Sequence, residues 1–236
     1  MPAPRPLLLL PGLLCDARLW RAQIEGLAGQ AECQVADLTL DDSLAAMARR
    51  ALAAAPPRFA LCGLSMGGYV AFEILRQAPE RVERLALFDT SARPDTPEAA
   101  RRRRGLMTLA RGDRAGGGFR GVTPRLLPQL LHPARLDGPL GREVMAMAEA
   151  VGREAFLRQQ AAILGRPDSR PLLPGLRLPS LVVVGEADAL TPPALAAEIA
   201  AGIPGARLAV LPGCGHLPPI EDPEATTALL RSWLGA

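Results

Sequence analysis

Six short apolar runs recur along the chain, and segments with helical spacing separate them. The runs lie at 7–10, 34–38, 59–62, 85–88, 181–184 and 208–211. Most are continuously apolar rather than alternating, which is typical of strands buried on both faces of a parallel sheet. Strands that alternate with helices imply right-handed crossovers, so the pattern predicts a three-layer α/β domain with about six strands.

Capping residues mark where the predicted helices begin. Asp16 precedes one helical pattern, and either Asp42 or Ser43 precedes the next. Thr191 stands before two prolines and Asp222 before one, and proline is favoured in the first turn of a helix. A further helix is expected directly after Ser65. We expect the helix after Asp16 to end near a glycine, at position 29.

The stretch 92–179 breaks this alternation, because it contains helical patterns but no convincing strand. It is rich in Arg, Gly and Pro. We therefore predict that residues 1–91 and 180–236 form the α/β core, with 92–179 as a helical insertion between the fourth and fifth strands. A detachable second domain is the alternative interpretation of the same stretch.

Composition narrows the class of protein. The chain has 236 residues, of which 49% are hydrophobic, and this suits one α/β domain with a full core. The net charge of +3 is mild, aromatic residues make up 3%, and no basic patch is interleaved with aromatics, so nucleic-acid binding is not indicated. The four cysteines are scattered, which favours separate reduced thiols.

The N-terminal sequence MPAPRPLLLLPGLLC imitates an export signal, but three features argue against one. The apolar run is short, Pro11 and Gly12 interrupt it, and the bulky Leu13 and Leu14 stand where a cleavage site needs small residues. We interpret it as a buried strand and turn. No stretch is long enough to span a membrane, so we expect a cytoplasmic protein.

The segment GLSMGG at 63–68 follows a predicted strand and opens a predicted helix. In a G-x-S-x-G turn of this kind the serine is exposed on a strained backbone, and side chains two positions away would clash. Gly63 and Gly67 are therefore expected for steric reasons, and Ser65 is the candidate nucleophile. The backbone N–H of Met66 would be free to bind an oxyanion. A glycine-rich turn with an incidental serine is the alternative.

A serine nucleophile needs a base, and the chain has two histidines. His216 follows the sixth apolar run in the glycine-containing loop GCGH, so it is the candidate base. His132 lies inside the insertion and is interpreted as a solvated residue at a helix end.

The imidazole in turn needs an acid to orient it. Asp188, after the fifth run, is the candidate, and Asp89, after the fourth run, is a rival at the end of a neighbouring strand. Glu186 is interpreted as structural and Asp168 as a loop-capping acid. The second oxyanion donor is expected to be the backbone N–H of Leu13, with Leu14 as the alternative.

Together these residues resemble the α/β-hydrolase superfamily. The matching motifs are LLLLPGLL at 7–14, GLSMGG at 63–68, GEADALTPP at 185–193 and GCGHLPPIEDP at 213–223. The resemblance implies a nucleophile at Ser65, a base at His216, an acid at Asp188 and an oxyanion hole at Leu13 and Met66. It also implies an acyl-enzyme route on small to medium acyl or aryl carboxylic esters, with a small-molecule substrate and no metal or organic cofactor.

Two departures from the family pattern affect the expected fold. The usual His-Gly after the first strand is replaced by Pro11-Gly12, which removes a polar side chain near the site. The chain also enters its first strand almost at once, whereas most relatives first form an N-terminal β-hairpin. We therefore expect a smaller sheet in which all strands are parallel.

Several functions share the same three side chains. Hydrolysis of lactones, thioesters or C–C bonds and acyl transfer all remain open, as does a ligand receptor built on a hydrolase scaffold. Serine at position 65, where dehalogenases have aspartate, argues against halide displacement.

The insertion adds two expectations about the substrate. Its apolar residues either roof the site or pack its helices together; these are Leu106, Met107, Leu126, Leu127, Leu130, Leu131, Met145, Met147 and Phe156. The run Arg101–Arg104 is either a solvated helix face or an attractor of anionic substrates.

Overall fold

The computed structural model describes residues 3–112 and 119–235. It contains one six-stranded sheet in the order β2-β1-β3-β4-β5-β6, in which every neighbouring pair is parallel. The strands are β1 (Arg5–Leu10), β2 (Ala31–Val35), β3 (Phe59–Leu64), β4 (Val82–Phe88), β5 (Ser180–Gly185) and β6 (Arg207–Leu211). This confirms the predicted parallel sheet, and Arg5 and Pro6 belong to β1 rather than to an antiparallel strand.

Helices follow the strands as the capping residues predicted. They are α1 (Arg21–Gly26), α2 (Leu44–Ala54), α3 (Met66–Gln77), α4 (Pro97–Gly112), α5 (Pro139–Leu164), α6 (Pro193–Gly202), α7 (Pro218–Glu221) and α8 (Pro223–Gly235). Short 3-10 helices lie at Ala17–Trp20, Pro79–Arg81, Leu127–Gln129, Pro133–Arg135 and Arg170–Gly175. Of the two caps considered for α2, Ser43 is the one that accepts a hydrogen bond, from Ala46 N at 3.3 Å.

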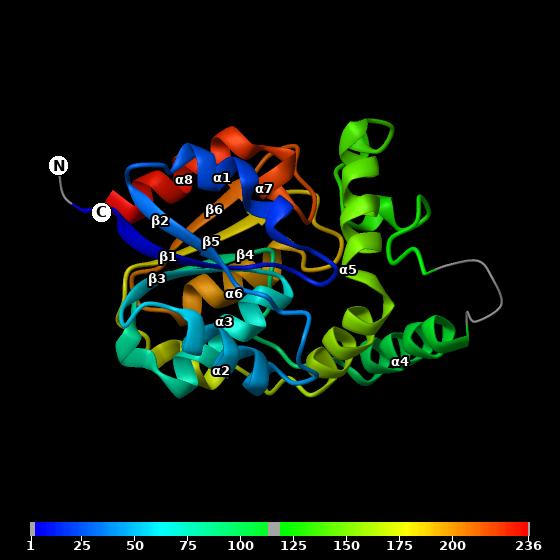
Figure 1. Ribbon diagram of the computed structural model, residues 1–236. Coiled ribbons are helices and arrows are strands. Elements are labelled where there is room, and N and C mark those ends of the chain that lie inside the picture. Colours follow the sequence, from blue (N-terminus) through cyan, green and yellow to red (C-terminus); the bar gives the residue numbers. More distant parts are fainter. Residues whose placement is uncertain (1–2, 113–118, 236) are drawn as a thin grey trace.

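Helices cover both faces of the sheet, because alternate residues of each strand point to opposite sides. Leu8 and Leu10 belong to one buried cluster, which holds side chains of α2, α3 and α6. Leu7 and Leu9 belong to the other, which holds side chains of α8 and of the segment around α1. Figure 1 shows the same three layers, with α1, α7 and α8 on one side of the strands and α2, α3 and α6 on the other.

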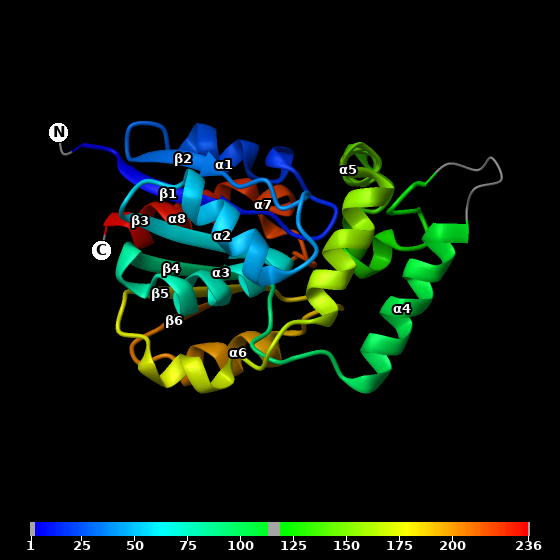
Figure 2. The same cartoon turned by 60° about the horizontal axis from the view of Figure 1, so that its bottom comes forward.

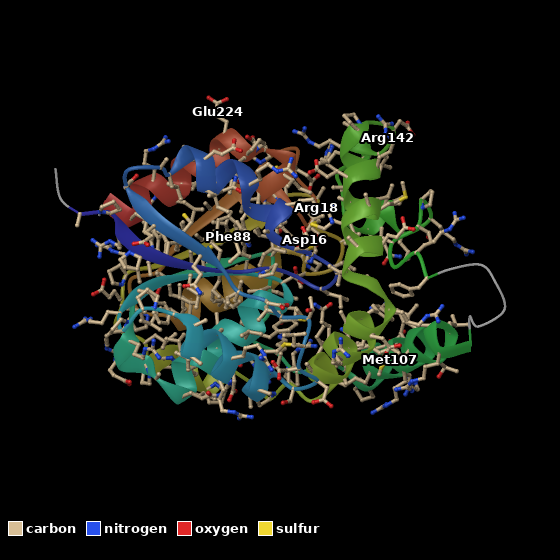
Figure 3. The ribbon with its side chains drawn as sticks, viewed as in Figure 1. Asp16, Arg18, Phe88, Met107, Arg142 and Glu224 are labelled. Atoms are coloured by element: carbon tan, nitrogen blue, oxygen red, sulfur yellow. The ribbon has the colours of Figure 1, made fainter. Side chains whose placement is uncertain are left out.

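The second core cluster reaches the end of β4. Trp20 meets Phe88 edge to face, with ring centroids 5.8 Å apart, and Figure 3 shows Phe88 within the layer of strands. Both rings are fully buried. This packing fixes the carboxyl end of β4, to which the serine turn is hydrogen-bonded.

Two predicted elements had the wrong bounds. The second strand covers 31–35 rather than 34–38, because Asp37 accepts hydrogen bonds from the N–H and hydroxyl of Thr39 and turns the chain out of the sheet. The first helical segment is a 3-10 turn followed by α1, which ends at Gly26 rather than near Gly29. Asp16 does cap it, accepting from Arg18 N at 3.0 Å.

Between β4 and β5 the described residues form helices and turns but no strand. The long element α5 bends at Gly152, which has φ 82°. Figures 1 and 2 show α4 and α5 standing beside the carboxyl ends of the strands. The division into a core and a 92–179 insertion stays a prediction.

None of the helices in the described ranges has the length and apolar character that crossing a membrane requires. The four cysteines are all free thiols.

Candidate active site

The serine turn joins β3 to α3 through a strained backbone. Ser65 has φ 54° and ψ −113°, a conformation that costs a non-glycine residue on the order of 1–3 kcal/mol. A Cβ on Gly63 would lie 2.4 Å from Gly67 O, and one on Gly67 would lie 2.1 Å from Leu10 O. Both glycines are therefore required by backbone contacts that cannot give way.

The end of β4 holds this turn from the other side. Ser65 N donates to Phe88 O at 2.9 Å, and the hydroxyl of Thr90 donates to Ser65 O at 2.8 Å. A third glycine is also required, because a Cβ on Gly68 would lie 2.4 Å from Thr90 Oγ1. Contacts with β1 and hydrogen bonds to the end of β4 thus fix the serine turn at the carboxyl ends of the strands.

Hydrogen bonds connect Ser65, His216 and Asp188, which are far apart in the sequence. His216 Nε2 lies 2.9 Å from Ser65 Oγ, and His216 Nδ1 lies 2.8 Å from Asp188 Oδ2. An ionised carboxylate can only accept, so the proton sits on Nδ1 and the lone pair of Nε2 faces the serine hydroxyl. This arrangement can remove a proton from Ser65.

Asp188 is held as a carboxylate. Its side chain accepts hydrogen bonds from Leu190 N, Thr191 N and the Thr191 hydroxyl, besides that from His216. Burial opposes ionisation, but His216 and the bonds from Thr191 outweigh it and hold the pKa of Asp188 well below its usual value. The position expected from the sequence thus carries the charged acid.

Asp89, the rival acid, has a different environment. It is fully buried at φ 44°, and its Oδ1 accepts from Gly185 N at 2.8 Å. Burial and the negative charge of Asp188 raise the pKa of Asp89 well above its usual value. Its environment therefore favours the neutral form of Asp89, and the imidazole Nδ1 is hydrogen-bonded to Asp188 rather than to Asp89.

Of the two oxyanion donors expected from the sequence, Met66 directly follows Ser65 at the start of α3, and Leu13 lies in the turn after β1. A Cβ on Gly12 would lie 3.5 Å from Ser65 Cβ, so the turn after β1 passes close to the serine. The N–H groups of Leu13 and Met66 form no hydrogen bond outside the regular elements of the described chain. The alternative donor Leu14 is ruled out, because its N–H donates to Gln159 Oε1 at 3.0 Å.

Sequence reasoning missed two buried side chains that hold these loops. Gln159, on α5, accepts from Leu14 N and also donates to Leu38 O at 3.2 Å, so it joins α5 to the turn after β1 and to the loop after β2. Glu221, on α7, accepts from the N–H groups of Gly215 and Leu217 on either side of His216. Gln159 carries no local motif signal, because only folding brings α5 to the loops that it holds. Glu221 lies within the motif GCGHLPPIEDP, a few residues from the N–H groups that it binds, so its position in the sequence was a usable signal.

The side chains of the remaining candidates form no hydrogen bond with Ser65, His216 or Asp188 in the described part of the chain. His132 Nδ1 accepts from Ala134 N at 3.2 Å and caps a 3-10 turn. Asp168 accepts from Arg170 N at 3.0 Å, as a loop-capping acid does, and Glu186 is exposed.

A metal would have to compete with this network. Ligand atoms of Asp89, Asp188 and His216 lie within 4.8 Å of one another. Both nitrogens of His216 already form hydrogen bonds, and burial favours the neutral form of Asp89, so the donor set fits a proton-transfer site better than a cation site.

A cavity of about 550 Å³ opens above Ser65 and His216. Of the apolar residues expected in the insertion, five line it: Leu106, Leu126, Leu130, Met147 and Phe156. Met107, Leu127, Leu131 and Met145 are not among its described lining residues, and Figure 3 shows Met107 on α4. Cys15 also lines the cavity, but burial and the charge of Asp16 raise the pKa of its thiol to about 12, so it stays protonated.

Comparison with known proteins agrees with this fold. The model of the Alpha/beta hydrolase family matches residues 7–229, so the chain belongs to the alpha/beta hydrolase family. Among curated relatives, the pimeloyl-(acyl-carrier protein) methyl ester esterase of Edwardsiella ictaluri is 31% identical over an alignment of 237 positions, gaps included, that covers 96% of this chain and 92% of the relative. The enzyme of that name from Neisseria meningitidis serogroup C is 32% identical over 183 residues, covering 74% and 68%.

Solved structures extend the likeness across the whole chain. A thermophilic esterase from Thermogutta terrifontis, described as malate bound, is 34% identical with a TM-score of 0.87, covering 99% of this chain and 90% of its own. The enol-lactonase from Burkholderia xenovorans LB400 is 26% identical with a TM-score of 0.84, covering 100% and 93%.

The steric account of the serine turn predicts unequal effects of two Gly→Ala substitutions. We expect Gly67→Ala to lower the free energy of unfolding by at least about 3 kcal/mol, because backbone atoms of β1 must move. Gly105→Ala, in α4 with nothing within 4 Å, should instead stabilise the protein by roughly 0.5–1 kcal/mol. Urea unfolding of both variants measures the difference, and equal effects would contradict the account.

Replacing each of the two buried aspartates by asparagine should affect activity very differently. Asp89→Asn replaces a neutral acid with a neutral amide of the same shape, so kcat/KM for an ester should change by less than about three-fold, whereas Asp188→Asn should lower it by roughly 10⁴-fold. The reverse result would make Asp89 the orienting acid.

Stability should also depend on pH in a defined direction. A raised pKa means that the stability contributed by Asp89 is complete below its unfolded pKa and is lost as pH rises through its folded pKa. Asp89→Asn removes this loss, so its stability relative to wild type should increase between pH 4 and pH 8. Urea unfolding at both pH values measures the difference in free energy of unfolding between the variant and wild type. If that difference does not grow with pH, Asp89 is ionised in the folded protein.

Proposed function

We propose that this protein is a serine esterase that cleaves carboxylic esters of small to medium acyl or aryl groups through an acyl-enzyme at Ser65. The observation that carries the proposal is the unbroken hydrogen-bond path from Ser65 Oγ through His216 to Asp188. The named relatives support the same chemistry, because several are esterases that match most of the chain.

In the first step Ser65 Oγ attacks the ester carbonyl while His216 Nε2 takes its proton. Asp188 stabilises the imidazolium that forms, and it keeps the ring oriented toward the serine. The N–H groups of Leu13 and Met66 bind the developing oxyanion. His216 then gives the proton to the leaving alcohol, and the acyl group remains on Ser65.

In the second step water replaces the alcohol. His216 takes a proton from the water as it attacks the acyl-enzyme, and the same proton returns to Ser65 when the carboxylic acid leaves. All of these proton transfers occur between Ser65, His216, the leaving alcohol and water, so the route calls on no metal or organic cofactor. The apolar residues of segment 92–179 act in this proposal as a cap over the site, and the cytoplasmic location stays a prediction from the sequence.

The relatives suggest two substrate classes to test. Methyl esters are named for the curated relatives, and an enol-lactone is named for one solved structure. Both substrates present a carbonyl to a serine in the same way, and in a lactone the leaving alcohol stays attached to the acyl group. A substrate panel should therefore include methyl esters, p-nitrophenyl esters of increasing chain length, aryl esters and lactones.

Replacing the nucleophile should abolish turnover. We expect Ser65→Ala to lower kcat on p-nitrophenyl esters by at least roughly 10⁴-fold and to prevent labelling by a fluorophosphonate. Ser91→Ala is the matched control, because Ser91 lines the same cavity but its hydroxyl accepts only from Arg93 N within the described chain. Turnover that survives in Ser65→Ala, or ligand binding without turnover of any panel member by wild type, would contradict the proposal.

Loosening the turn after β1, which carries the proposed oxyanion donor Leu13, should slow the reaction without weakening substrate binding. Gln159→Leu leaves Leu14 N and Leu38 O without their partner, so we expect kcat to fall roughly ten-fold with KM nearly unchanged. Gln129→Leu makes the same change at an exposed residue that lines the cavity, and it should have little effect on kcat. A rise in KM at constant kcat would show that Gln159 serves substrate binding instead.

A further inference from the structure

Charge is distributed unevenly around the cavity. Its apolar lining includes Val144, Met147 and Phe156 on α5, together with residues of the turn after β1, of α4 and of the loops around His216. The lining residues that carry a fixed charge are four arginines and one aspartate: Arg93, Asp95, Arg102, Arg103 and Arg166. The cavity beside Ser65 therefore combines a mostly apolar lining with an excess of positive charge.

Two of these arginines share the single aspartate. Arg103 Nε lies 2.9 Å from Asp95 Oδ2, and Arg166 Nη1 lies 2.7 Å from Asp95 Oδ1. The side chains of Asp95, Arg103 and Arg166 are only 6%, 19% and 9% exposed. One carboxylate cannot neutralise two guanidinium groups, so positive charge remains where little water can screen it.

Neighbouring groups keep the two guanidinium planes in position. The Arg166 guanidinium lies 4.4 Å over the ring of Tyr69, which stands one helical turn after Ser65 on α3. Arg103 Nη1 donates to Gln160 Oε1 on α5. Within the described residues Arg166 Nη2 donates no hydrogen bond, so it retains donors for a ligand.

The other two arginines differ in how far they are neutralised. Arg93 pairs with Glu198 at 2.9 Å, and Glu198 is not a lining residue. Arg102 is exposed and lines the cavity, and it forms no ion pair with any residue in the described ranges. The run Arg101–Arg104 is thus divided, with Arg102 and Arg103 on the cavity and Arg101 and Arg104 off it.

We propose that Arg102, Arg103 and Arg166, here called the arginine wall, bind a carboxylate at the far end of the substrate's acyl chain. The preferred substrates are then monoesters of dicarboxylic acids. Guanidinium groups recognise carboxylates with paired, charge-assisted hydrogen bonds, and the apolar lining accommodates the methylene chain between the two ends. This inference rests on the proposed ester hydrolysis at Ser65.

The test compares pairs of p-nitrophenyl esters that differ in the terminal carboxylate. The monoesters of glutaric, adipic and pimelic acid are matched with the esters of pentanoic, hexanoic and heptanoic acid. We expect wild type to favour the acidic member of at least one pair by roughly ten-fold or more in kcat/KM, the value of one hydrogen bond to a charged group. Added salt should reduce this preference, because it screens the attraction.

Variants within one arginine run locate the effect. Arg103→Gln should lower the preference for the acidic ester by roughly ten-fold and leave hydrolysis of the neutral ester nearly unchanged. Arg104→Gln removes the same charge one residue away, off the cavity, and it should change neither rate. Arg102→Gln, at an exposed residue without an ion pair in the described chain, should reproduce part of the effect even if Arg103→Gln does not fold.

Three outcomes would overturn the inference. Wild type that hydrolyses neutral esters in a Ser65-dependent way but shows no preference for any acidic ester would remove it and leave the proposed function standing. Equal losses on both esters in Arg103→Gln, with no effect of Arg102→Gln, would mean that the arginines only hold the Asp95 loop. Equal effects of Arg103→Gln and Arg104→Gln would make the attraction a property of the whole surface. Failure of wild type on every ester would instead count against the proposed function itself.

Discussion

The contact between two backbones beneath Ser65 is the constraint on which the site depends. The first turn of α3 lies so close to the end of β1 that no side-chain atom fits at Gly67, and Gly63 meets the same turn from β3. This closeness forces the chain into a turn too sharp for ordinary backbone angles, and the half-buried serine at its apex lines the cavity. The hydrogen bond from Ser65 N to Phe88 O then fixes that apex to β4.

Charge separation within the buried acids follows from where each carboxyl finds donors. Asp188 accepts bonds from backbone, hydroxyl and imidazole groups, so the charged form is stabilised in spite of burial. Asp89 is fully buried, with one backbone donor and a charged neighbour of the same sign, so its neutral form is favoured. The environments of the two neighbouring carboxyl groups thus push their pKa values in opposite directions.

The loops around the site are held by two buried side chains, one close in the sequence to the loop that it holds and one remote from it. Glu221 binds the backbone on both sides of His216, and Gln159 joins the turn after β1 to α5. Through Gln159, α5 is coupled to the turn after β1. Arg103 and Arg166 make a similar connection, because both meet Asp95 in the loop that follows β4. The helices between β4 and β5 are thus tied to the loops around Ser65 by buried polar contacts.

The amino-acid sequence alone determined the layered fold and the positions of the reactive groups. Continuous apolar runs indicate most strands of the parallel sheet, and the spacing of the glycines indicates the serine turn. Local signals also placed His216 and both candidate acids at strand ends. Only the tertiary structure decided between Asp188 and Asp89, because the choice depends on donors brought from other loops. It likewise decided which arginines of one run line the cavity, since a helix points successive residues in different directions and only part of a run can face one way.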